Sequence, residues 1–535
     1  MEYDLLITGG YLVDGVGNPW FRADLGIKDG RIEAVGDLQR ATASRKIEAK
    51  GLTVTPGFID MHSHSDFYVL LNPNEESKIF QGVTTEVVGN CGSSAAPMND
   101  ELRAYREKYM RQRLGPDFEF NWSSMNEYIE RVNEEGSSFN VLPLVGHGTV
   151  RSNAIGFENR RPTDEEMRKM RDLVAKSMEE GGWGLSTGLI YTPGCYAETD
   201  EIVSLAGVAA RYHRPYSSHI RGEGETLLRA VAEAIEIGEK AEIPVEISHF
   251  KASGREYWGM TERSLELVRK ARARGLDVTV DQYPYTASST GLSAYLPLWV
   301  HDGGNDMMLE RLKDPDIREK IKGEPEMAER EWSQVVVALA EKHPEHTGKS
   351  IGDIAEIQGK DPLDTVFDLL IEEEASVSIV AFGMCEEDVR RVMKSPYMMV
   401  GTDGSAVSPE GILGRGKPHP RFYGTFPRIL GHYVGEEGVL TLQEAVRKMT
   451  SLPAQKIGLK DRGLLHEGMM ADIAVFDADE ILDQATFTDP HRFPRGIYYV
   501  IVEGEIVVEK SKHTGALAGR ALKKSDYVHY LNRGY

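Results

Sequence analysis

Cysteine is scarce in this 535-residue chain, which contains only Cys91, Cys195 and Cys385. Three widely spaced cysteines offer no disulfide framework, so an important cysteine here is predicted to be a free thiol or a metal ligand. Basic residues are also in deficit, with 62 Lys and Arg against 84 Asp and Glu and a net charge of -22. That charge repels a phosphate backbone, so we expect no nucleic-acid partner.

Long hydrophobic runs are absent as well. No apolar stretch approaches the roughly 18 residues of a membrane span, and residues 1–4 lack the basic and apolar regions of a signal peptide. We therefore expect a cytoplasmic protein with no membrane partner. The acidic composition does not decide the oligomeric state.

Both ends of the chain show the alternating pattern of short antiparallel strands. Residues 1–54 alternate apolar and polar positions between turn signals, and the same alternation is found at 471–477 and 500–508. We expect one small β-sandwich domain formed from both chain ends, residues 1–54 and 456–535.

The middle of the chain, residues 55–455, alternates short apolar runs with amphipathic helical patterns. Helices are expected at 164–180, 200–212, 225–241, 262–274 and 442–450, and Thr163 with Glu166 and Thr441 with Glu444 have capping-box spacing. Eight strands are expected at 58–62, 86–91, 141–147, 185–191, 216–219, 245–249, 278–283 and 398–403. Eight strand–helix units predict an α/β fold, a TIM-like (β/α)8 barrel.

One interval is much longer than the spacing of about 30 residues between successive strands, because Asp281 and Asp403 lie about 120 residues apart. We expect an inserted lid subdomain at about 286–349, small and helical, over the barrel mouth. The alternative is a surface insertion without a role in the site.

The strongest functional signal is an apolar strand that ends in His62 and His64. A spacing of two places both imidazoles on one face of a strand, where they can converge on one ion. Further polar residues follow the predicted strand ends, and these are Cys91, His219, His249 and Asp403. Since the C-terminal strand ends form the active-site face of an α/β barrel, these side chains are predicted to meet. Taken singly, Cys91 could be a small buried hydrophobe and each histidine a structural one.

At these residues the whole chain resembles the amidohydrolase superfamily, and most closely its D-aminoacylase branch, the N-acyl-D-amino-acid deacylases. The matching segments are 56–64 (PGFIDMHSH), 89–92 (GNCG), 218–221 (SHIR), 248–251 (SHFK), 281–285 (DQYPY), 401–404 (GTDG) and 419–421 (HPR). A cysteine in the second-strand motif is specific to that branch, since many relatives use a carboxylated lysine on strand 4.

The resemblance implies a metal-dependent hydrolase. One Zn²⁺ would be held tightly by Cys91, His219 and His249, and a second, weaker or empty position would be surrounded by His62, His64 and Asp403. A metal-activated water would be the nucleophile and Asp403 the general base and acid. The alternative for Asp403 is a carboxylate that only orients a ligand histidine.

The resemblance also implies a small-molecule substrate, an N-acyl-D-amino acid, and how it would bind. Arg421 would pair with the α-carboxylate, with Tyr191, Tyr283 and Ser289 as hydrogen-bond partners. Two further basic residues are alternatives for this role. These are Arg221 and Lys251, and Arg221 is more simply an ion-pair partner. Residues 291–298 contain no basic side chain, which points to a hydrophobic substrate side chain.

Two other functions remain open. A cyclic amidohydrolase such as a dihydropyrimidinase would usually bridge its metals with a carboxylated lysine, which Cys91 argues against. A non-catalytic relative would use the barrel for binding alone, but such proteins tend to lose metal ligands, and here every ligand position is occupied.

Overall fold

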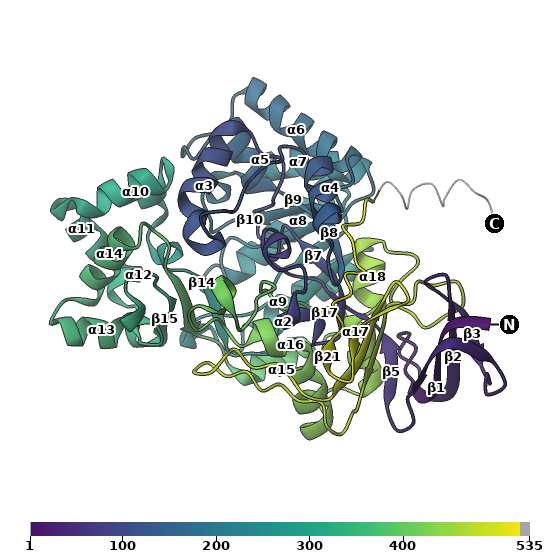
Figure 1. The fold of residues 1–535 in the computed structure, drawn as a ribbon. Helices are drawn as coiled ribbons and strands as arrows, with labels where there is room; N and C mark the ends of the chain where they lie inside the picture. The colour runs from purple at the N-terminus through teal and green to yellow at the C-terminus, as the bar shows by residue number, and fades with distance from the viewer. Residues whose placement is uncertain (1, 525–535) are drawn as a thin grey trace.

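The computed structural model describes residues 2–524, so Met1 and the last part of the expected C-terminal β domain, 525–535, lie outside the described residues. Its centre is a ring of short parallel strands (Figure 1). One sheet has the order β6-β7-β8 and a second the order β17-β13-β12-β11-β10-β9. The strands are β6 (Phe58–Asp60), β7 (Val83–Val88), β8 (Asn140–Pro143), β9 (Val145–Gly146), β10 (Leu185–Gly188), β11 (Tyr216–His219), β12 (Val245–Ile247), β13 (Val278–Gln282) and β17 (Met398–Val400).

The two sheets join into a closed barrel at both seams. At one seam, the strand expected at 141–147 is interrupted at Leu144, so that β8 pairs with β7 and β9 pairs with β10. At the other seam, the backbone N–H of Met61 donates to the carbonyl of Val400 at 3.1 Å, which links β6 to β17. The prediction of a (β/α)8 barrel is confirmed.

The helices expected from periodicity all form within one or two residues of the predicted bounds, as α6 (Asp164–Glu179), α7 (Thr199–Arg211), α8 (Leu227–Ala241), α9 (Thr261–Ala273) and α17 (Leu442–Met449). Both predicted capping boxes are present, at Thr163 and at Thr441. The other barrel helices are α1 (Tyr68–Leu71), α2 (Glu76–Ile79), α3 (Asp100–Leu114), α4 (Met125–Glu135), α5 (His147–Ala154), α15 (Glu386–Met393), α16 (Arg421–Arg428) and α18 (Ser451–Ile457). Among residues 2–524, no helix combines the length and apolar character needed to cross a membrane.

The insertion is larger and less helical than expected. Its strands, β14 (Ala287–Gly291), β15 (Val335–Leu339) and β16 (Ser378–Phe382), form an antiparallel sheet in the order β14-β16-β15. Five helices lie beside the sheet, at the left of Figure 1: α10 (Gly304–Lys313), α11 (Pro315–Lys322), α12 (Pro325–Ala328), α13 (Ile351–Gln358) and α14 (Pro362–Glu372). The insertion therefore extends to Phe382 rather than to 349. The pairing of β14 with β16 joins segments about 90 residues apart, which local periodicity cannot reveal.

The two chain ends share one nine-stranded sheet (Figure 1). Strand β18 pairs antiparallel with β5, so that Ile473 lies opposite Pro56 and ties the C-terminal part to the N-terminal part. A separate hydrophobic cluster that includes Leu5, Ile27 and Ile501 fills this region. The strands are β1 (Glu2–Leu12), β2 (Phe21–Lys28), β3 (Arg31–Gly36), β4 (Thr42–Glu48), β5 (Thr53–Pro56), β18 (Ile473–Phe476), β19 (Ile497–Val502), β20 (Glu505–Glu509) and β21 (Lys512–His513).

Candidate metal centre

The candidate ligands gather at the C-terminal ends of the barrel strands. His62 and His64 follow β6, and Cys91 follows β7. The remaining candidates end or follow strands β11, β12 and β17, and they are His219, His249 and Asp403. A cavity of about 590 Å³ opens there, and its wall includes Cys91 and Asp403 together with side chains of the insertion.

Three of these residues leave their strands in an unusual backbone conformation. Cys91, His249 and Asp403 have positive φ angles of 52°, 34° and 49°. A left-handed conformation costs a non-glycine residue about 1–3 kcal/mol and persists only where the surroundings enforce it. Here the backbone N–H of His249 donates to Asp281 at 2.8 Å, and that of Asp403 donates to the carbonyl of His62 at 2.8 Å. The strain is thus concentrated at the residues whose side chains converge.

The first cluster consists of one thiol and two imidazoles. The sulfur of Cys91 lies 3.5 Å from Nδ1 of His219 and 3.5 Å from Nε2 of His249, and these two nitrogens are 2.8 Å apart. Burial lowers the pKa of His249 to about 4 and that of His219 well below its usual value, so both rings are neutral and keep a lone pair. Burial raises the pKa of the Cys91 thiol. Donor atoms about 2.0–2.3 Å from one Zn²⁺ lie at comparable mutual separations, so this donor set fits a zinc ion.

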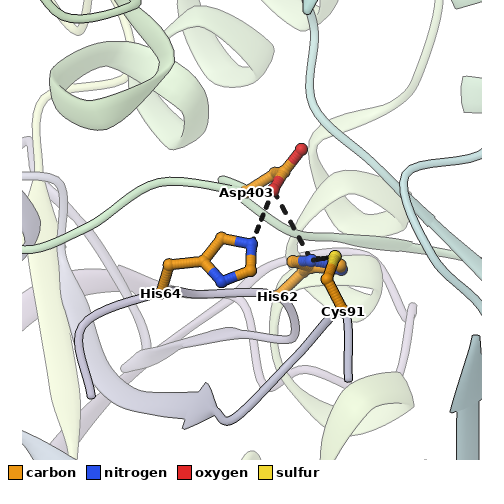
Figure 2. Close-up of side chains that lie close together, drawn as sticks. All are labelled: His62, His64, Cys91 and Asp403. Atoms are coloured by element: carbon orange, nitrogen blue, oxygen red, sulfur yellow. Dashed lines mark hydrogen bonds and ion pairs between the residues drawn. The ribbon is translucent and has the colours of Figure 1, made fainter. Parts of the chain in front are cut away.

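Figure 2 shows the second cluster, which consists of His62, His64, Asp403 and Cys91. Cys91 belongs to the first cluster as well. The sulfur lies 3.3 Å from Nε2 of His62. Oδ1 of Asp403 is 3.0 Å from Nε2 of His64 and 3.5 Å from Nε2 of His62. A single thiol between two groups of donors is the arrangement in which a sulfur could bridge two ions.

Two carboxylates, one buried and one partly buried, hold the histidines from outside the clusters. Oδ2 of Asp281 is 3.0 Å from Nδ1 of His62, and Oε1 of Glu223 is 3.1 Å from Nδ1 of His249. Such partners fix the orientation and tautomer of a ligand imidazole. Burial raises the pKa of Asp281 to about 7. Sequence reasoning placed Asp281 on a strand without a site role and missed Glu223, whose one signal is its position four residues after His219.

The residues expected to bind substrate lie around both clusters, with Tyr191 beside His219 and Lys251 beside His249 of the first. Nη1 of Arg421 is 2.9 Å from Oδ2 of Asp403, and Nη2 donates to the carbonyl of Ser289 at 3.3 Å. The guanidinium lies 4.4 Å from the ring centre of Tyr283. The hydroxyl of Tyr191 is 3.1 Å from Oγ1 of Thr290. Of the predicted set, Arg421, Tyr191, Ser289 and Lys251 line the cavity.

Arg221 points away from the clusters. Its guanidinium pairs with Glu233 at 2.9 Å and donates to the carbonyls of Cys195 and Ala197. The ion-pair interpretation of this residue fits these contacts, and the substrate-binding alternative does not.

A buried lysine that the sequence did not reveal connects the strand ends. The ammonium of Lys78 lies 2.8 Å from Asp60, 2.8 Å from Glu86 and 2.7 Å from Oγ1 of Thr402, and its side chain is fully buried. It thereby joins β6, β7 and the loop that carries Asp403. A lysine on a four-residue helix would ordinarily be exposed, so the pattern gave no sign of this role.

Lys78→Met is expected to destabilise the protein by about 3–5 kcal/mol, because two buried carboxylates would lose their counter-charge. The free energy of unfolding in urea measures this effect. Lys176→Met is the control, since Lys176 is 66% exposed and only 3.7 Å from Glu180, and it should change stability by less than about 0.5 kcal/mol. Equal effects of the two substitutions would contradict the assigned role of the buried network.

Comparison with known proteins agrees with this architecture. The model of the amidohydrolase family matches residues 45–508. The chain is 36% identical to D-aminoacylase of Alcaligenes xylosoxydans xylosoxydans over 98% of both chains. It is 37% identical to N-acyl-D-glutamate deacylase of the same organism, over 94% of this chain and 93% of that one.

Among solved structures, N-acyl-D-glutamate deacylase of Bordetella bronchiseptica is similar over 98% of this chain and 100% of its own, with 34% identity and a TM-score of 0.83. That protein was crystallised with zinc and a phosphonate mimic of the tetrahedral intermediate. Family match, full-length identity and shared fold agree with one another. The chain therefore belongs to the amidohydrolase family, in its D-aminoacylase branch, and is a hydrolase.

Proposed function

We propose that the protein is a zinc-dependent deacylase that hydrolyses the amide bond of N-acyl-D-amino acids to a carboxylate and a free D-amino acid. One observation carries the proposal. A thiol and two neutral imidazoles meet in a cavity that also contains a carboxylate and a guanidinium, Asp403 and Arg421. The activities named for the relatives support the same substrate class.

Cys91, His219 and His249 would hold one ion tightly, because their donor atoms lie within 3.5 Å of one another. A second, weaker position would lie between His62, His64 and Asp403. Bound Zn²⁺ would supply a Lewis acid that polarises the amide carbonyl and makes water a better nucleophile.

Asp403 would act as general base and then as general acid. Burial raises the pKa of Asp403, but the guanidinium of Arg421 and the imidazole of His249 lower it by more. The pKa therefore lies well below its usual value. The carboxylate is therefore ionised and can accept the proton of the attacking water and pass it to the departing amine. Burial keeps the pKa of Tyr191 well above its usual value, so its hydroxyl stays protonated and can donate to the developing oxyanion.

Arg421 would bind the α-carboxylate of the substrate. Arg421 lines the cavity, and its buried Nε has no hydrogen-bond acceptor among the described residues, so this donor would be available to a bound carboxylate. Tyr283 packs against the guanidinium and would hold its orientation, and the hydroxyl of Ser289 would add a hydrogen bond.

The substrate side chain would be hydrophobic. Gly291, Ala294 and Tyr295 come from the segment without basic residues and line the cavity. Lys251, a nearby cation, is already paired with Glu223 at 2.5 Å. The cavity is also lined by Arg106, Arg113 and Arg415, but beside Gly291, Ala294 and Tyr295 themselves an apolar group would be favoured over a second carboxylate.

Arg421→Ala is expected to lower kcat/KM about 100-fold more for N-acyl-D-amino acids than for their α-carboxamide analogues. The lost charge-assisted contact corresponds to about 3 kcal/mol, and only the free carboxylate can make it. The amide analogue also controls for the lost contact with Asp403. Arg221→Ala should affect both substrates equally. Equal losses on both substrates for Arg421→Ala would remove this residue from carboxylate binding.

The overall proposal is tested by metal analysis combined with an amine-release assay on N-acetyl-D- and N-acetyl-L-amino acids, apolar and acidic, with dihydrouracil as a cyclic amide. We expect about one tightly bound zinc per chain, release from apolar D-substrates, and loss of turnover after chelation that Zn²⁺ restores. Turnover of the cyclic amide alone would instead favour a dihydropyrimidinase-like enzyme, and metal-free protein without turnover would favour a binding relative.

A further inference from the structure

Glu223 contacts both histidines of the first cluster from the side opposite Cys91. Its Oε1 is 3.1 Å from Nδ1 of His249 and 4.0 Å from Nε2 of His219. The nitrogens that face the sulfur are the other ones, Nε2 of His249 and Nδ1 of His219. Glu223 thus lies where it can accept a proton from the outer nitrogen of a ring whose inner nitrogen must keep its lone pair.

Lys251 competes for the same outer nitrogen. Its Nζ lies 2.9 Å from Nδ1 of His249 and 2.5 Å from Oε1 of Glu223. An ammonium can only donate, so a bond from Lys251 to Nδ1 would leave the proton of a neutral ring on Nε2. The nitrogen that faces Cys91 would then have no lone pair. With the proton on Nδ1 and Glu223 as its acceptor, Nε2 is free.

We infer that Glu223 is a positioning residue that keeps the proton of His249 on Nδ1, because its carboxylate can accept both that proton and a hydrogen bond from the ammonium of Lys251. The inference rests on the proposed metal centre, because it concerns which histidine nitrogen can bind an ion. Lys251 loses nothing in this arrangement, since it still donates to Glu223 and to the backbone carbonyl of His249 at 2.9 Å. The carboxylate therefore acts on metal affinity through His249 and need not touch the substrate.

The test measures the zinc affinity of the purified full-length protein by competition with a chelator. Glu223→Leu removes the acceptor and should weaken binding about 10- to 100-fold, the usual cost of losing such a partner. Glu223→Gln keeps an acceptor oxygen without the charge and should bind with intermediate affinity. Glu233→Leu is the matched control, because Glu233 pairs with Arg221 at 2.9 Å, away from the histidines, and it should bind zinc like the wild type. Circular dichroism verifies that each variant is folded.

A second substitution separates this role from a merely structural one. Adding Lys251→Met to Glu223→Leu removes the competing donor and should recover about tenfold of the lost affinity, whereas a structural defect would persist in the double variant. Lys251→Met alone should bind zinc like the wild type, since Glu223 remains. Wild-type affinity in Glu223→Leu, or no recovery in the double variant, would overturn the inference while leaving the metal centre intact. A wild-type protein that binds no zinc would overturn the metal centre and this inference with it.

Discussion

Asp403→Asn is expected to retain bound zinc while kcat falls about 10²- to 10⁴-fold, the range that general acid–base catalysis contributes. The amide has nearly the shape of the carboxylate and can keep the contacts of Oδ1 with His62 and His64. It cannot take a proton from water, nor return one to the departing amine. Steady-state kcat at saturating substrate and zinc content per chain, measured on the same sample, separate these two effects.

A matched control for this substitution lies outside the cavity. Asp388 is also a buried aspartate paired with an arginine, Arg391, and Asp388→Asn should leave kcat unchanged in the folded protein. Near-normal turnover in Asp403→Asn would move the base to another residue. Loss of zinc together with turnover would instead indicate that Asp403 acts mainly as a ligand.

The regular part of the fold could be predicted because local chemistry and final structure agree there. Helix α6 begins where Thr163 and Glu166 cap it, and barrel strands such as β7 and β13 are short segments rich in Val and Thr that are buried throughout. The bounds of the insertion were harder to predict, since its strand β16 is defined by pairing with β14 across the subdomain. Only long-range contacts fix such a boundary, and a single sequence does not record them.

The same distinction holds for the site. His62, His64 and Cys91 stand out only as a group, because a structural explanation for every one of these reactive side chains at strand ends would require several coincidences. Lys78 and Glu223 do not, because a lysine on a short helix and a glutamate in a loop are ordinarily solvated. Lys78 is buried against partners elsewhere in the chain, such as Asp60, and Glu223 is partly buried beside Lys251. Thus the convergence of these side chains at the strand ends could be predicted from the sequence, whereas the residues that hold them in place required the structure.

Cys91→Ala is expected to remove most of the bound zinc and, with it, the activity. The sulfur belongs to both donor clusters, so its loss leaves two imidazoles in one and takes the shared atom from the other. Losing a residue that is hydrogen-bonded to a metal ligand usually lowers metal affinity about 10- to 100-fold. Losing the ligand itself should cost more, so we expect zinc affinity to fall by more than about 100-fold. Zinc content after dialysis and chelator competition measure the loss. Cys195→Ala, at another buried cysteine, should keep its metal.

The backbone at Cys91 offers a way to separate loss of the thiol from loss of stability. Its φ of 52° strains alanine as it strains cysteine, whereas glycine adopts this conformation freely. Cys91→Gly and Cys91→Ala should therefore differ in their free energy of unfolding. Both variants should nevertheless lose zinc to the same extent, because neither has a sulfur. If zinc retention instead followed the free energy of unfolding across the two variants, the cysteine would be structural, and the two clusters would need another atom to join them.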